Sequence, residues 1–244
     1  ADLVEIRGQR GITLNQILEV NRTSIDILPL KMRRMTAFLK KGYVKEFFVD
    51  FETIGGMFDE FNSLPIAQCQ NMIFMITVGW VNFDEEKKEI YQHKTFTAEN
   101  LQVESERKIM NQFLSLIGHD SELFHWSDAE PNEWLSALKR HDMNQKDSLK
   151  DRWTDLHYIF REEPITVKGA LNYSLKSIAK AMLKLGYISE GWTLECQDGM
   201  TAMLKAHQAY QNNNFSLLKE IEEYNQIDTK ILWQIVTFLR NTLL

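Results

Sequence analysis

Three closely spaced runs of aromatic and β-branched residues constrain the fold of this chain more than any other feature of its sequence. They are EFFVDFE at 46–52, MIFMITVGWVN at 72–82 and EIYQHKTFT at 89–97, and polar or glycine-containing segments separate them. Such runs are typical of β-strands, and three in succession predict an antiparallel meander.

The segments after the meander alternate in character. Their apolar spacing predicts a helix over 100–117, a short strand over 123–126 and a helix over 131–141 that begins at a proline. Strands followed by alternating helix and strand indicate an α/β fold with a mixed β-sheet flanked by helices.

The remainder of the chain is predicted to be mainly helical. A polar linker at 142–150 is followed by helices over 174–185, 200–211 and 215–244. Helices are also predicted before the meander, over a segment that Thr13 caps and over 30–41. The second of these carries basic residues that favour either a solvated helix face or a basic contact face, namely Lys31, Arg33, Arg34, Lys40 and Lys41.

We therefore expect two parts, a short helical N-terminal lead-in at 1–44 and one α/β domain at 45–244. The chain begins with Ala rather than Met, which suggests that it is processed or cut from something longer. One interpretation of 1–44 is a remnant of an upstream domain.

Charge and cysteine content exclude several classes of protein. The 244 residues include 28 basic and 34 acidic side chains, a net charge of −6, which argues against a purely electrostatic nucleic-acid binder but not against a metal-dependent enzyme. Cys69 and Cys196 lie far apart, so neither a zinc site nor a disulfide framework is predicted. The longest apolar run, 72–81, is about half of the ~20 residues that span a membrane. We expect a soluble intracellular protein, in the cytoplasm, nucleoid or nucleus, with no membrane partner.

The first candidate site lies at the end of the first strand. Asp50 and Glu52 are two residues apart, so they point to the same face, while Val49 and Phe51 pack on the other. Carboxylates in apolar surroundings need a partner or a cation, and Mg²⁺ takes oxygen ligands. The alternative is a strand end with two solvated acids.

The second candidate lies in the last helix. Tyr224 and Asp228 are four residues apart and share a face with several apolar residues. An acid on an apolar stripe needs a basic group, a hydrogen-bond cluster or a metal ion. The Tyr-x-x-x-Asp spacing alone is also frequent by chance.

A third group of acids follows the predicted strand at 123–126. His125, Asp128 and Glu130 precede a helix, and Asp155 lies among large apolar residues further on. Further carboxylates could converge here with the first pair. Each also has a structural interpretation, because Asp128 can cap the helix and Glu130 can favour its N-terminal end.

Taken together, FFVDFET, LFHWSDAEP, WTDL with NYSLKSIAKAMLKLGY, and EEYNQIDTKILWQIVTFL resemble the DEDD (DnaQ-like) superfamily of 3′-to-5′ exonucleases, in the version whose third motif is Tyr-x-x-x-Asp. More narrowly, they resemble predicted ribonuclease H-like nucleases found beside RecB-type or CRISPR-associated nuclease domains. The resemblance covers about 45–244 and implies a ribonuclease H-like fold.

The resemblance also implies roles for individual residues. Asp50, Glu52 and Asp228 would be metal ligands, and Tyr224 would orient the attacking water. The second motif offers Glu130, with His125 in place of the usual Asn. Asp128 is kept as the alternative ligand, and Asp155 matches a further Asp that would support the ligands.

The implied activity is phosphodiester hydrolysis by two Mg²⁺ or Mn²⁺ ions, most simply from the 3′ end of single-stranded DNA or a duplex end. The expected partner is nucleic acid, DNA rather than RNA, together with other domains or subunits of a larger nuclease or helicase-type protein. His125 and Lys176 are candidate nucleic-acid contacts, although Lys176 also fits a solvated helix face. The alternative is a catalytically silent ribonuclease H-like module that binds nucleic acid or a partner protein.

Overall fold

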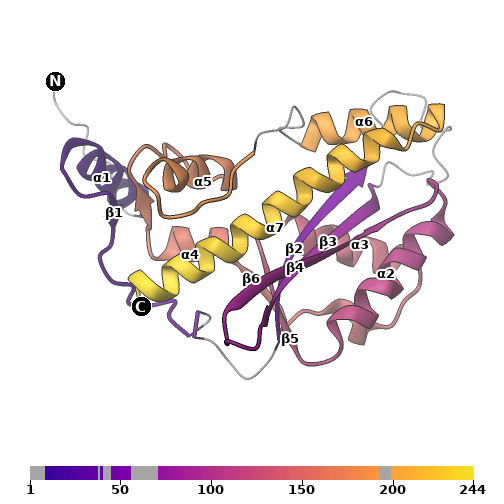
Figure 1. Cartoon of the computed structure of the whole chain (residues 1–244), viewed down its shortest axis with the longest axis horizontal. Coiled ribbons are helices and arrows are strands. Elements are labelled where there is room, and N and C mark those ends of the chain that lie inside the picture. Colours follow the sequence, from indigo (N-terminus) through magenta and orange to yellow (C-terminus); the bar gives the residue numbers. More distant parts are fainter. Residues whose placement is uncertain (1–8, 38, 41–44, 56–70, 193–198) are drawn as a thin grey trace. The chain divides into compact units, whose positions relative to one another are not determined.

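The protein is represented by a computed structural model, shown in Figure 1. The structure describes residues 9–37, 39–40, 45–55, 71–192 and 199–244. The chain divides into two compact units: unit 1 comprises Ala1–Gly42, Asp155–Gly191 and Gln234–Leu244, and unit 2 comprises Tyr43–Thr154 and Trp192–Trp233. Among the described residues, no helix has the length and apolar character needed to cross a membrane.

Unit 2 is built around a sheet with the strand order β4-β3-β2-β5-β6. The strands are β2 (Lys45–Ile54), β3 (Met72–Phe83), β4 (Glu89–Thr97), β5 (Ser121–His125) and β6 (Trp153–Asp155). β2, β3 and β4 form the predicted antiparallel meander, and β5 runs parallel to β2. The predicted mixed α/β sheet is thus confirmed, and the carboxyl ends of β2 and β5 meet at the same edge.

Two helices cover one face of this sheet, α2 (Val103–Ile117) and α3 (Ala129–Arg140). Phe51 of β2 packs edge-on against Phe113 of α2, with 5.8 Å between ring centroids, and lies 6.1 Å from Trp134 of α3. Phe113 and Trp134 are fully buried, so these rings form the centre of the hydrophobic core on this face.

A tyrosine on β4 fixes helix α7 (Ser216–Thr242) over the opposite face. The Tyr91 hydroxyl donates to Thr229 Oγ1 at 2.8 Å, and its ring stacks on Trp233 with centroids 5.3 Å apart. Tyr91 reaches across β3 at Gly79, where a Cβ atom would lie 2.1 Å from the phenolic oxygen. Only glycine leaves this space, and the contact sets α7 on the same face as Asp50.

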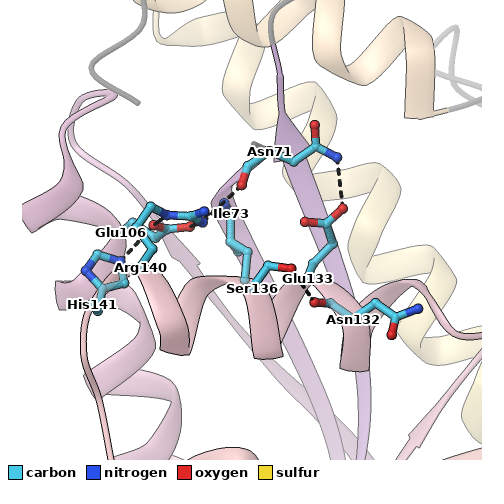
Figure 2. A network of polar contacts seen from close by, with 8 residues as sticks. All are labelled: Asn71, Ile73, Glu106, Asn132, Glu133, Ser136, Arg140 and His141. Atoms are coloured by element: carbon cyan, nitrogen blue, oxygen red, sulfur yellow. Dashed lines mark hydrogen bonds and ion pairs between the residues drawn. The ribbon is translucent and has the colours of Figure 1, made fainter. Parts of the chain in front are cut away.

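A buried acid ties the helical layer to the sheet, as Figure 2 shows. Glu106 of α2 accepts hydrogen bonds from the Ile73 N–H and from Arg140 Nη2, both at 2.7 Å. Its other oxygen accepts from Arg140 Nε at 2.9 Å and lies 2.7 Å from His141 Nε2. Burial would raise the pKa of Glu106, but hydrogen bonds from His141 and Arg140, with the Arg140 charge, bring the pKa below its ordinary value.

Unit 1 combines short elements from three parts of the chain. They are α1 (Gln9–Arg22), β1 (Ile27–Leu28), α4 (Leu156–Glu162), β7 (Thr166–Val167), α5 (Leu175–Lys184) and the last residues of α7. β1 and β7 pair antiparallel in a two-stranded sheet. The helices predicted over 174–185, 200–211 and 215–244 correspond to α5, α6 (Gly199–Asn212) and α7.

The helix predicted over 30–41 is wrong, because the described residues of that stretch contain no helix. The Glu163 carboxylate accepts hydrogen bonds from the three successive backbone N–H groups of 33–35, and the Met32 N–H donates to the Leu243 carbonyl at 2.7 Å. These long-range acceptors take the N–H groups that a helix would have paired internally.

Smaller expectations also change. Thr13 lies within α1 rather than at its start, so it is not an N-cap. The linker at 142–150 contains a short 3-10 helix, η2 (Gln145–Ser148). Lys41, Cys69 and Cys196 lie outside the described residues.

Candidate active site

The predicted carboxylate pair lies near the carboxyl end of β2, the central strand of the sheet. Asp50 pairs across the ladder with Thr77, and Glu52 pairs with Met75, just before a register irregularity. Glu52 is buried and Asp50 is half-buried. Both side chains leave the strand on the face opposite Phe51, so the alternation of β2 separates the apolar core from the acids.

Glu130 enters the same region from the start of α3, just after the loop that follows β5. Ser127 in this loop has a φ of 77°, which is uncommon for a residue with a side chain and brings the chain sharply into α3. Glu130 lies in the first turn of α3 and is buried. Its Oε2 lies 3.4 Å from Nδ1 of buried His125, and neither atom has a hydrogen-bond partner among the described residues.

Helix α7 supplies the remaining groups on consecutive turns. Tyr224, Asn225 and Asp228 are buried, and spacings of three and four residues place them on one face. With its amide oriented to satisfy its neighbours, Asn225 donates to Glu52 Oε1 at 2.9 Å and to Asp50 Oδ2 at 3.2 Å. This single amide therefore bridges Asp50 and Glu52.

A tryptophan also contacts the acid of α7. Trp192 Nε1 donates to Asp228 Oδ1 at 2.7 Å. The indole thus holds the carboxylate orientation without adding charge, since its N–H is a donor only.

Four acids, Asp50, Glu52, Glu130 and Asp228, form what we call the carboxylate cluster. The pKa of Asp50 is raised well above its ordinary value, first by burial and then by the negative charges of Asp228, Glu130 and Glu52 and by a hydrogen bond with Glu130. Like charges that share a buried site oppose one another's ionisation. Ionisation of Asp50 is therefore unfavourable in the folded protein, and a bound cation would offset the repulsion.

Tyr224 responds to the same charges. Burial is the largest cause that raises its pKa, followed by the charges of Asp228, Asp50 and Glu52 and by a hydrogen bond with Asp228. The phenol therefore stays protonated at any physiological pH. It acts as a hydrogen-bonding group rather than as a base.

The chemistry of the cluster fits a hard divalent cation. Its donors are carboxylate oxygens, which Mg²⁺ and Mn²⁺ accept, and positive charge would relieve the mutual repulsion that raises the Asp50 pKa. Among the described residues, however, no three or more His, Cys, Asp or Glu side chains already surround one point as a metal site does. Asn225 and Trp192 occupy some of the carboxylate oxygens instead.

The other predicted residues lie apart from these contacts or in unit 1. Asp128 is exposed at the N-cap position of α3, with no side-chain capping hydrogen bond. Asp155 is the N-cap residue of α4, and Lys176 lies in the first turn of α5. Both belong to unit 1, so their proposed roles at the site stay predictions.

Sequence reasoning missed two of the groups described above. Asn225 lies three residues before Asp228, so its position on the acid-bearing face of the helix was available as a signal. Trp192 comes from a segment with no pattern that links it to α7. Only the folded chain brings its indole to Asp228.

The family of the chain follows from this fold together with one comparison. The strand order, the three antiparallel strands and the parallel β5 describe an RNase H-like sheet with acids at its carboxyl edge. A family model described as the RNase_H superfamily matches residues 47–240, and the chain belongs to this superfamily. A search of curated proteins finds no match. Membership indicates a nuclease or a nucleic-acid-binding module.

Proposed function

We propose that the protein is a metal-dependent 3′-to-5′ exonuclease of the DEDD type with a Tyr-x-x-x-Asp third motif, acting on single-stranded DNA or DNA ends. The observation that supports this most strongly is the carboxylate cluster, in which acids from β2, the start of α3 and α7 raise the Asp50 pKa together. A buried group of acids whose charges raise the pKa of one member is characteristic of functional sites.

In this proposal Asp50, Glu52, Glu130 and Asp228 hold two Mg²⁺ or Mn²⁺ ions. Bound ions of this class activate water and stabilise the charge that develops on the phosphate and on the leaving oxygen. Asn225 and Trp192 keep the carboxylates aimed by donating to Asp50, Glu52 and Asp228.

Tyr224 would position the water. Because its raised pKa keeps the phenol protonated, its proton is donated to Asp228, while its oxygen retains lone pairs that accept a hydrogen bond from a water molecule. Tyr224 thus orients the nucleophile and does not remove its proton.

A labelled-oligonucleotide assay tests the proposal. With Mg²⁺ or Mn²⁺, a 5′-labelled single strand should shorten one nucleotide at a time, and a 3′-labelled strand should release a labelled mononucleotide at once. Asp50→Asn and Asp228→Asn should each reduce the rate by at least about 10²-fold, the scale found when one essential charge-stabilising group is lost. Undiminished degradation by both variants would sink the proposal.

A matched control uses an acid near the cluster. Asp128→Asn removes the same charge at the exposed N-cap position of α3, two residues before Glu130, and it should retain the wild-type rate. If Asp128→Asn abolishes activity while Glu130→Gln does not, Asp128 is the second-motif ligand instead.

A catalytically silent module is the second candidate function. It is favoured by the hydrogen bonds from Asn225 and Trp192 that already occupy acid oxygens, and by the absence, among the described residues, of three or more acids around one point. Calorimetry with Mn²⁺ separates the two. An exonuclease should bind two ions in a manner that Asp50→Asn weakens, whereas a silent module should show no such binding.

A further inference from the structure

The basic residues at 31–34 have no role in the carboxylate cluster, and they line a cavity of about 570 Å³ within unit 1. Its walls come from α1, from the segment after β1 and from the end of α4. A cavity of this size is in the range of small-molecule binding sites.

A single acid, Glu163, binds the backbone of residues 33–35. Glu163 is buried, and its carboxylate accepts N–H groups of Arg33, Arg34 and Met35, at 3.0 Å from Arg33 and 2.5 Å from Met35. Three successive N–H groups that converge on one carboxylate form an anion-binding nest. Because Glu163 fills that nest, the segment is fixed and the side chains of Lys31, Arg33 and Arg34 are left at the cavity.

These three side chains are exposed, and none makes an ion pair with another described residue. Exposed Glu19, half-buried Glu162 and buried Glu163 also line the cavity, so its lining carries both basic and acidic side chains. An anionic ligand would lie against the basic side chains.

A nucleic-acid backbone supplies a ligand of this kind. Its phosphates are anionic, so they can pair with the three basic side chains at the cavity.

We propose that this cavity is an accessory nucleic-acid site, in which Lys31, Arg33 and Arg34 bind backbone phosphate. The site lies in the unit that does not hold the carboxylate cluster. It requires that the chain binds nucleic acid, but it does not require that the chain cleaves it.

Fluorescence anisotropy with a labelled single-stranded oligonucleotide, performed on the full chain in EDTA, tests the site without catalysis. Arg33→Gln/Arg34→Gln should weaken binding about 5- to 10-fold near physiological salt and reduce the salt-dependence slope by about 1.4, for two lost phosphate contacts on a single strand. The backbone N–H groups that bind Glu163 remain in this variant, so thermal unfolding should be unchanged.

A matched control removes two exposed cations of unit 2. Arg107→Gln/Lys150→Gln changes the net charge by the same amount and should bind the oligonucleotide as the wild type does. Glu19→Gln should act in the opposite direction and tighten binding about two- to threefold, because it removes a like charge from the cavity wall.

Two results would overturn the site. The first is that Arg33→Gln/Arg34→Gln binds the oligonucleotide as tightly as the wild type does. This includes the outcome in which the variant loses affinity for anionic lipid vesicles but not for the oligonucleotide. The other is an equal loss in both double variants, which would mean that net charge alone governs binding. A different outcome is that the wild type binds through this site and yet shows no nuclease activity in the oligonucleotide assay. That outcome would contradict the exonuclease proposal and leave the proposed binding site intact.

Discussion

Glu106 and Asp50 are both carboxylates within unit 2, but the side chains around them differ in charge. Those around Glu106 are basic, and those around Asp50 are acidic. Glu106 receives hydrogen bonds from Arg140, His141 and a backbone N–H, so its pKa falls (Figure 2). Burial raises the pKa of Asp50, and the neighbouring acids raise it further. The charge of Glu106 is thus compensated within the protein, whereas a proton or a cation would relieve the charges around Asp50.

Of the substitutions considered, removing the Glu106 carboxylate should reduce the stability of the fold most. We expect Glu106→Gln to lower the free energy of unfolding by about 3–5 kcal/mol, because it removes the negative charge that pairs with the buried Arg140 guanidinium at 2.7 Å. Urea unfolding measures this change. Exposed Glu104→Gln, two residues away on α2, is the matched control and should change stability by less than about 0.5 kcal/mol.

The second largest effect concerns the amide that bridges the β2 acids. Asn225→Leu keeps a similar volume but removes hydrogen bonds to Asp50 and Glu52, and it should destabilise the metal-free protein by about 1.5–3 kcal/mol. It should also weaken Mn²⁺ binding, measured by calorimetry, about 10- to 100-fold. Unchanged stability would mean that Asn225 does not compensate the acids.

Substitution within the cluster should have the opposite sign from that at Glu106. Asp50→Asn should stabilise the metal-free protein by on the order of 1 kcal/mol, because each unit by which a pKa is raised costs about 1.4 kcal/mol when the group ionises. The new amide can still donate to Glu130 and accept from Asn225. Thermal unfolding in EDTA is the measurement, and a lower melting temperature would contradict the comparison.

Some features of the fold and of the carboxylate cluster could be predicted from the sequence. The meander, the mixed sheet and the facing pair Asp50 and Glu52 followed from alternation along β2, which is a local property. Tyr224 and Asp228 followed from helical spacing. Local rules suffice here because each pair belongs to one element.

The groups that hydrogen-bond to these acids and to Glu163 could not be predicted in the same way. The indole of Trp192 and the nest around Glu163 depend on segments that are distant in sequence. The same long-range contacts explain why the predicted helix over 30–41 is absent from its described residues. Backbone N–H groups of this stretch donate to Glu163 and to the Leu243 carbonyl. These tertiary hydrogen bonds outweigh the helical preference indicated by the apolar spacing.

The pH dependence of stability separates the two acids without any substitution. The raised pKa of Asp50 means that the folded protein binds a proton more tightly than the unfolded chain does. Metal-free stability should therefore rise as the pH is lowered through this raised pKa toward 3.8, its ordinary value, by at most about 1.4 kcal/mol per pH unit for one proton. Glu106 has the opposite sign: its stabilisation is complete above its ordinary value of 4.5 and is lost as the pH falls through its lowered pKa.

The stability of the metal-free wild type should thus pass through a maximum in mildly acidic solution, measured as the urea midpoint across pH. In Asp50→Asn the rise on the neutral side should shrink, while the fall at low pH persists because Glu106 still causes it. With saturating Mn²⁺ the wild-type rise should also shrink, since a bound cation favours the ionised acids. A rise that survives both changes would assign it to groups outside the carboxylate cluster.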